Sequence, residues 1–155
     1  GYSTTFMDMF PFLVASQGSL DHLNTLLPEP VPINRFRPNI LVDNCDPFGE
    51  DLWDEIKIND LVFQGVRLCS RCKVPTVNQE TGVMGKAEPT ETLMKFRSDN
   101  VLMPDKKPRG KVFFGKEMVW NWNLTNTEGE GKKTIKVGDT ISVIRKIPSR
   151  VVAAV

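Results

Sequence analysis

Hydrophobic and polar positions alternate along much of this chain in a way that predicts many short strands. Five segments are apolar, aromatic or alternating enough to form strands, and they are residues 10–15, 39–43, 53–58, 61–68 and 112–122. Two further strands are expected at residues 134–137 and 140–147. The clearest hairpin joins residues 53–58 to residues 61–68, because residues 59–60 between them can turn the chain.

Two short helices are expected among these strands. Leucines recur at helical spacing over residues 20–27, and Ser19 can cap the first turn. A second helix is expected over residues 89–97, since its opening proline suits the first turn of a helix. The polar residues 98–110 are expected to form a loop, and residues 123–133 an exposed connection.

The order of these elements predicts a mainly β domain with short helices and the architecture of a barrel, since no internal repeat and no strand–helix–strand rhythm is visible. A chain of 155 residues is long enough for one domain with its own core. We expect that domain over residues 1–147 and a tail over residues 148–155. The chain starts with Gly1 and carries no signal-peptide pattern, so we expect a piece of a longer protein.

Composition and charge narrow the class of protein. Hydrophobic residues make up 40% of the chain and charged residues 25%, which is typical of a folded, soluble domain. The net charge of +1 gives no reason to expect binding to nucleic acid or to a membrane surface, and no apolar run is long enough to span a bilayer. Three cysteines cannot all pair within the chain, which favours a reducing, intracellular compartment.

Two of the three cysteines lie in the motif CSRC at residues 69–72, which several kinds of chemistry would explain. A redox dithiol of this spacing belongs at a helix N-terminus in a strand–helix–strand unit, but no such unit is visible and Pro75 disfavours a helix. A structural zinc site would also need Cys45 and His22, far away in the sequence. Simple packing in the core and binding of a metal by a thiolate remain open.

The two cysteines of the motif are expected to differ. Cys69 continues the strand at residues 61–68, so we expect it to pack in the core as a small apolar residue. Cys72 lies past the end of that strand, beside Arg71 and Lys73, and a neighbouring cation favours a thiolate. We therefore expect Cys72 to be accessible at the mouth of a cleft, where a thiolate is a good ligand for a soft metal.

A second cluster of chemistry lies in NRFRPN, residues 34–39. Arg35 and Arg37 are two residues apart, so in an extended segment they would share one face. Arginine binds phosphate through a two-pronged contact and stays charged. Solvated surface charge and binding of an anionic ligand both remain open on residue chemistry alone.

Several motifs taken together resemble the MOSC domain, the molybdenum-cofactor sulfurase C-terminal domain. They are RFRPNILV at residues 35–42, EDLWDEIKIND at 50–60, CSRC at 69–72, TGVM at 81–84 and IKVGD at 135–139. The resemblance extends over about residues 6–147, and within the superfamily it is strongest to the mitochondrial amidoxime reducing component. The combination of FRPN and CxRC with WDE between them is specific, whereas no single motif is.

This resemblance implies a MOSC-type, pyruvate-kinase-like β-barrel that binds a molybdopterin cofactor. The second cysteine of CSRC, Cys72, would bind the molybdenum. An acidic residue near the metal in relatives matches Asp8. The cofactor contacts implied by the family's motifs are Arg37, Asn39, Ser70 and Arg71. Glu117 stands where animal relatives place a tyrosine near the cofactor, so that contact is not carried over.

The family also implies an activity. It reduces small N-hydroxylated compounds with electrons from a small b-type haem cytochrome and its NADH-dependent reductase, and a mitochondrial location goes with it. Two alternatives use the same domain: the C-terminal domain of a molybdenum cofactor sulfurase, which transfers sulfur, and a non-catalytic cofactor carrier. The family's N-terminal domain is missing from this sequence, so we expect the fragment alone to lack the cofactor and to be inactive.

Overall fold

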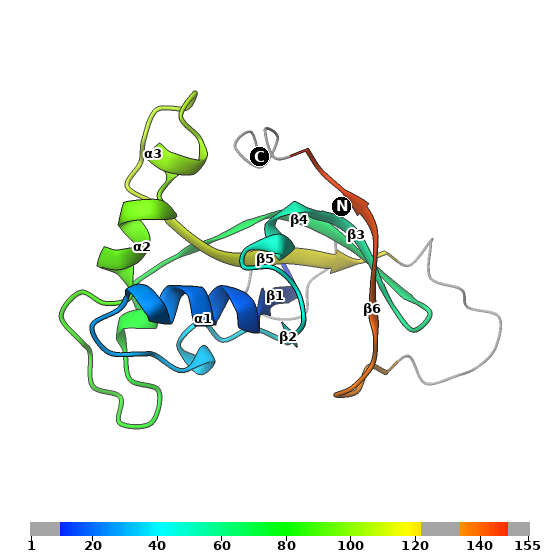
Figure 1. The fold of residues 1–155 in the computed structure, drawn as a ribbon, viewed down its shortest axis with the longest axis horizontal. Coiled ribbons are helices and arrows are strands. Elements are labelled where there is room, and N and C mark those ends of the chain that lie inside the picture. Colours follow the sequence, from blue (N-terminus) through cyan, green and yellow to red (C-terminus); the bar gives the residue numbers. More distant parts are fainter. Residues whose placement is uncertain (1–9, 122–133, 149–155) are drawn as a thin grey trace.

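The computed structural model describes residues 10–121 and 134–148, and its strands form one six-stranded sheet in the order β2-β1-β5-β4-β3-β6 (Figure 1). The strands are β1 (Phe12–Ser16), β2 (Ile40–Val42), β3 (Trp53–Ile58), β4 (Leu61–Arg71), β5 (Val112–Trp120) and β6 (Ile141–Lys146). Only β1 and β2 pair in parallel, and every other neighbouring pair is antiparallel. In Figure 1, β6 runs steeply across the direction of β4 and β5, because the sheet curls into a half-barrel. The predicted mainly β, barrel-type fold is confirmed.

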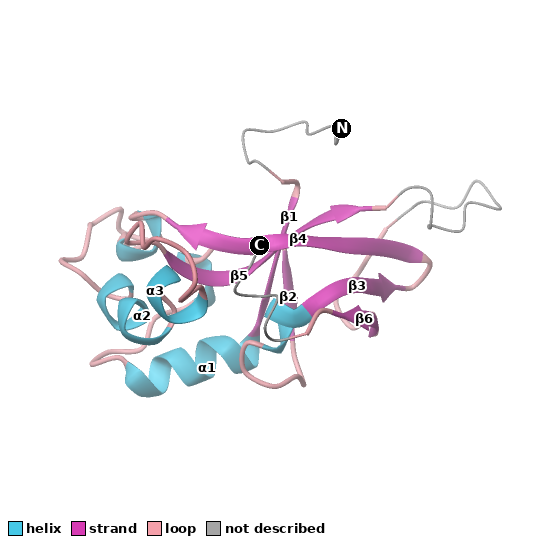
Figure 2. Cartoon of the chain, turned by 90° about the horizontal axis from the view of Figure 1, so that it is seen from above, coloured by secondary structure: helices cyan, strands magenta, loops and turns pink. Residues whose placement is uncertain are grey.

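Short helices cover one part of this sheet. The α-helices are α1 (Gln17–Leu26), α2 (Thr90–Phe96) and α3 (Asp99–Leu102), and the 3-10 helices are η1 (Ile33–Arg35), η2 (Gly49–Leu52) and η3 (Val74–Thr76). Figure 2 shows α2 and α3 close together, beside the end of the sheet where β5 begins. None of the helices in the described part of the chain is long and apolar enough to cross a lipid bilayer.

The start of α1 differs from the prediction. Ser16, not Ser19, caps the helix, because the Ser19 backbone N–H donates to Ser16 Oγ at 3.0 Å. The Ser19 hydroxyl instead donates to the carboxylate of Glu50 at 2.7 Å, and the Ser16 hydroxyl donates to the same carboxylate at 3.0 Å. Glu50 is fully buried and fixes the beginning of α1 to η2.

The core beneath the helices also positions the segment before β2. Leu20 and Leu23 of α1 and Leu93 of α2 pack in one cluster with Phe36 and Phe114. The rings of Phe36 and Phe114 are stacked with their centroids 3.9 Å apart, and both side chains are fully buried. Burial of such a side chain stabilises the fold by about 1.5–3 kcal/mol. Phe36 therefore anchors the FRPN segment to the core.

The other predicted elements are confirmed or corrected as follows. The β3–β4 hairpin is confirmed, and β4 continues to Arg71, so it includes the first three residues of CSRC. The predicted loop at residues 98–110 contains α3. The predicted strand at residues 134–137 is wrong, because the Lys136 N–H donates to the Asp139 carboxylate at 2.8 Å and closes a turn. The predicted connection at residues 123–133 lies outside the described residues.

Candidate functional site

A pocket of about 330 Å³ lies where the end of β4 meets the FRPN segment and the beginning of β1. The structure brings together five of the residues singled out in the sequence, which are Arg37, Asn39, Ser70, Arg71 and Cys72. They come from two segments more than thirty residues apart, so the pocket depends on the fold and not on one local motif. Asp8 lies outside the described residues. We call this cavity the CSRC pocket.

The FRPN segment is not extended, which corrects the expectation that Arg35 and Arg37 share one face. Arg35 ends η1, and its Nη1 donates to the carbonyl of Pro75 at 3.3 Å. Arg37 follows with a φ of +54°, in the left-handed region, and its side chain lines the CSRC pocket. A non-glycine residue in a sparsely populated backbone region costs about 1–3 kcal/mol, and such strain often accompanies function.

Asn39 links this segment to β1. Its Oδ1 accepts the Leu13 N–H at 2.7 Å, and its own N–H donates to the Leu13 carbonyl at 2.9 Å. These two bonds hold the side-chain amide at the wall of the CSRC pocket. The Nδ2 group of Asn39 bonds to no other described residue and is available as a donor to a ligand.

Arg71 connects the two motifs and is held rigidly. Its Nη2 donates to the carbonyl of Phe36 at 2.7 Å, its Nη1 contacts the sulfur of Cys69 at 3.0 Å, and its Cζ lies 5.7 Å from the centroid of the Phe36 ring. Its Nε is buried and has no hydrogen-bond partner among the described residues. An unpaired donor on a buried guanidinium is costly, so this atom needs an acceptor from outside the described residues.

The two cysteines both line the CSRC pocket, so the expectation that Cys69 turns away into the core is wrong. Cys69 and Arg71 are two residues apart on β4 and therefore face the same side of the sheet. Burial raises the pKa of the Cys69 thiol to about 11, so this thiol is protonated at neutral pH. Cys72 follows the end of β4 and is exposed, as expected, and its sulfur accepts the Val74 N–H at 3.5 Å.

The arrangement argues against two of the alternatives for the cysteine pair. Cys69 lies inside a strand, and the nearest following helix, η3, begins only at Val74, so neither thiol is at an α-helix N-terminus. Cys45 and His22, which a zinc site would need, do not line the CSRC pocket. Within residues 10–121 and 134–148, no three His, Cys, Asp or Glu side chains are placed to hold a metal ion together.

The sequence interpretation missed an ion pair at the wall of the pocket. Glu117 on β5 is opposite Arg67 on β4, and the Arg67 Nε lies 2.6 Å from Glu117 Oε2. The pair neutralises the only acidic side chain that lines the CSRC pocket in the described residues, so Arg37 and Arg71 give the pocket a net positive charge. A basic residue in one strand and an acidic residue in another could have indicated this ion pair. That inference requires the register between the two strands, which the sequence alone does not give.

The family follows from similarity to known proteins. A family model of the MOSC domain matches residues 1–142, so the chain belongs to the MOSC domain family, and the resemblance drawn from the motifs is confirmed. This chain is 37% identical over 139 residues to mitochondrial amidoxime-reducing component 1 of Homo sapiens, and the match covers 90% of this chain and 38% of the human protein. It is 42% identical over 96 residues to mitochondrial amidoxime reducing component 2 of Bos taurus, covering 62% of this chain and 29% of the bovine protein. The chain therefore spans less than half the length of these relatives.

Proposed function

We propose that this chain is the molybdenum-cofactor-binding domain of an oxidoreductase that reduces N-hydroxylated compounds. The observation that carries the proposal is the gathering of Arg37, Asn39, Ser70, Arg71 and Cys72 around one pocket. Membership of the MOSC family and similarity to proteins named for amidoxime reduction support it. The same relatives are named mitochondrial components, which supports the further proposal that the parent protein is mitochondrial.

The donors around the CSRC pocket fit an anionic pterin cofactor. Arg71 has a buried Nε without a partner in the described residues, and Arg37 is an exposed cation with no ion pair to another described residue. A cofactor phosphate offers the acceptors that these guanidinium groups and the Asn39 amide need. Ser70, between Cys69 and Arg71 on β4, also lines the pocket. These four side chains would hold and orient the cofactor.

Cys72 would hold the molybdenum through its sulfur. Its thiol is exposed in the CSRC pocket, and its sulfur accepts the Val74 N–H at 3.5 Å, which fixes the side chain at the pocket wall. Cys69 cannot play this part equally well, because burial raises its thiol pKa to about 11. When bound, the cofactor supplies the redox chemistry that removes an oxygen atom from the substrate.

The overall reaction defines the partners. Removal of the oxygen of an N–OH group as water consumes two electrons and two protons, so the parent protein needs an electron donor. We assign that part to a small b-type haem cytochrome, reduced by its NADH-dependent reductase. Asp8, outside the described residues, stays a predicted carboxylate near the reacting atoms.

The direct test is a metal analysis of the full-length protein followed by an activity assay. We expect near-stoichiometric molybdenum, and reduction of benzamidoxime to benzamidine when NADH, the reductase and the cytochrome are present. Omission of the cytochrome is the control, and it should stop NADH-dependent turnover. Protein without molybdenum would refute the proposal, and molybdenum-loaded protein without reduction would favour a cofactor carrier.

Replacing Arg37 by alanine should weaken binding of the cofactor without unfolding the protein. Arg37 is exposed and lines the CSRC pocket, so its loss removes a charge-assisted contact worth about 1.5–3 kcal/mol, or about 10–150-fold in affinity. The measurement is molybdenum content after dialysis of the full-length variant. Arg35→Ala is the matched control, because Arg35 lies two residues away and does not line the pocket. Equal molybdenum content in Arg37→Ala and the wild type would remove Arg37 from the proposed site.

A further inference from the structure

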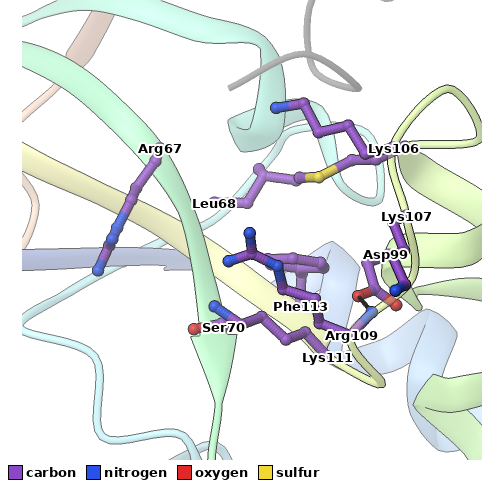
Figure 3. A pocket seen from close by; sticks show the side chains of 10 residues that line it. Arg67, Leu68, Ser70, Asp99, Lys106, Lys107, Arg109, Lys111 and Phe113 are labelled. Atoms are coloured by element: carbon purple, nitrogen blue, oxygen red, sulfur yellow. Dashed lines mark hydrogen bonds between the residues drawn. The ribbon is translucent and has the colours of Figure 1, made fainter.

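A second pocket, of about 470 Å³, is lined by basic side chains that the proposed function does not use (Figure 3). It lies between α3, the loop that follows it, and strands β4 and β5. We call it the basic pocket. The cations that belong to the loop are Lys106, Lys107, Arg109 and Lys111. Arg67 also borders it, but Figure 3 shows its side chain directed away from the loop, in keeping with its ion pair to Glu117.

Three of the four loop cations are not paired with an acidic side chain of the described residues. Lys107, Arg109 and Lys111 are exposed and form no ion pair within the described parts of the chain. The one acidic lining residue there, Asp99, accepts the backbone N–H groups of Arg109 at 2.6 Å and Asn100 at 3.0 Å. These donors, the Arg109 N–H foremost, lower the pKa of Asp99. Its carboxylate therefore fixes the backbone of the loop and not the lysine side chains.

The loop is tied at its base, so the backbone that carries the cations is held before a ligand arrives. The Asp99 N–H donates to the Lys111 carbonyl at 2.9 Å, and the Met103 N–H donates to the Asp99 carbonyl at 2.8 Å. The apolar side chains of Leu68, Met103 and Phe113 pack in one cluster beneath the loop and border the pocket. A held loop pays less conformational entropy when it binds a ligand.

A run of lysines is usually solvated surface, and two features distinguish this one. The cations surround a concave space with an apolar floor, and its volume is in the usual range for small-molecule sites. Asp105, in the same loop, does not border the space. Among the described residues the basic pocket shares Ser70 with the CSRC pocket and no other lining residue, so the two pockets are neighbours with otherwise different linings.

We propose that the basic pocket binds an organic phosphate that carries two or more phosphoryl groups. A single phosphate carries about −1.5 to −2 charges at pH 7, fewer than the positive charges of the loop. A di- or triphosphate matches them better, and Arg109 can make a two-pronged contact to it. The apolar floor formed by Met103 and Phe113 accommodates the organic part of the ligand.

Calorimetric titration of the full-length protein with ATP, inorganic triphosphate and adenosine tests the proposal. We expect saturable binding of ATP, weaker binding of triphosphate and none of adenosine. The double variant Lys107→Glu/Arg109→Glu should weaken ATP binding by about 100-fold or more, since each of the two lost charge-assisted contacts is worth about tenfold. The matched control is Lys86→Glu/Lys95→Glu, which changes the charge equally at exposed positions outside the pocket, and it should bind ATP like the wild type.

Several results would overturn this proposal and leave the proposed function of the CSRC pocket standing. Among them are no saturable binding of ATP or triphosphate, and equal weakening in the pocket and control variants. If Lys107→Glu/Arg109→Glu lost molybdenum, the cations would belong to the cofactor site instead. If the protein bound an acidic protein and neither phosphate probe, they would form a docking surface. Should the double variant not fold, Lys111→Gln offers the same comparison with a milder change.

Discussion

Replacing Cys72 by serine in the full-length protein is expected to reduce reductase activity by more than about 100-fold, since even residues that only support a metal ligand are worth about 10–100-fold. A hydroxyl is a poor substitute for a thiolate on a soft metal. The exposed sulfur of Cys72 lies in the same pocket as Arg37 and Arg71. The other thiol that lines this pocket, Cys69, is half-buried, so no second exposed thiol can replace that of Cys72. The measurement is the rate of benzamidoxime reduction, together with molybdenum content.

Cys69→Ser is the matched control, because it changes the same atom three residues away. Cys69 is half-buried and contacts Arg71, so its replacement should cost about 1 kcal/mol of stability, as point changes commonly do, and leave most of the activity. Alkylation gives a readout that needs no cofactor. With a pKa of about 11, about one Cys69 in a thousand is a thiolate at pH 8, so Cys72 should react with iodoacetamide first.

Two results would contradict this picture of the cysteines. Full reductase activity in Cys72→Ser would remove the sulfur from the mechanism. Faster alkylation of Cys69 than of Cys72 in the cofactor-free protein would mean that the burial found for Cys69 does not hold in solution. The first result concerns the function and the second the local structure, so they can fail independently.

The fold was predictable where local signals dominate. The β3–β4 hairpin follows from alternation and a turn pair, both of which are properties of neighbouring residues. The four residues of α3 are too few to show a helical period, and the turn is held by later backbone N–H groups that donate to the carbonyls of Ser98 and Asp99. The prediction of a strand at residues 134–137 failed because of one side chain. The Asp139 carboxylate accepts the Lys136 N–H, which a strand would need for its ladder.

The candidate site was predictable in its parts and not in its geometry. The motifs led to Arg37 and Cys72, and the structure gives both a place in one pocket. The alternation of β4 correctly puts Cys69 and Arg71 on one face, but nothing local says whether that face meets the core or the pocket. The Arg67–Glu117 pair needs the register between β4 and β5, which only the folded sheet defines.

Arg97 and Asp51 form a buried ion pair in the described part of the chain. Arg97 Nη2 lies 2.6 Å from Asp51 Oδ2, and the two side chains are only 5% and 6% exposed. The Arg97 Cζ also lies 4.3 Å from the centroid of the Phe48 ring, and the Arg97 Nε donates to the Phe113 carbonyl at 3.3 Å. Burial raises the pKa of Asp51 to about 6, and the nearby Arg97 charge opposes that shift without cancelling it. Removing these charges from water therefore costs more than their attraction returns.

Arg97→Met is expected to lower the free energy of unfolding by about 3–5 kcal/mol, because it leaves the buried Asp51 carboxylate without its main partner. Urea unfolding of the purified protein is the measurement. Arg145→Met is the matched control, since Arg145 is 55% exposed where it pairs with Asp54 and Glu55, and its loss should cost less than about 1 kcal/mol. The double variant Asp51→Leu/Arg97→Met removes both buried charges and should be clearly more stable than Arg97→Met alone. Equal stability of these two variants would contradict the argument.

The pH dependence of unfolding provides an independent check on the Asp51 assignment. Between an unfolded pKa near 3.8 and a folded pKa of about 6, the folded chain holds a proton that the unfolded chain has released. This part of the stability is therefore complete below about pH 4 and is lost as the pH rises to about 6, by at most about 3 kcal/mol. Asp51→Asn has no such proton, so the difference in unfolding free energy between wild type and Asp51→Asn should change by about that amount between pH 4 and pH 7. A difference that stays constant over this range would show that Asp51 does not titrate there, and that its charge is fully compensated in the folded protein.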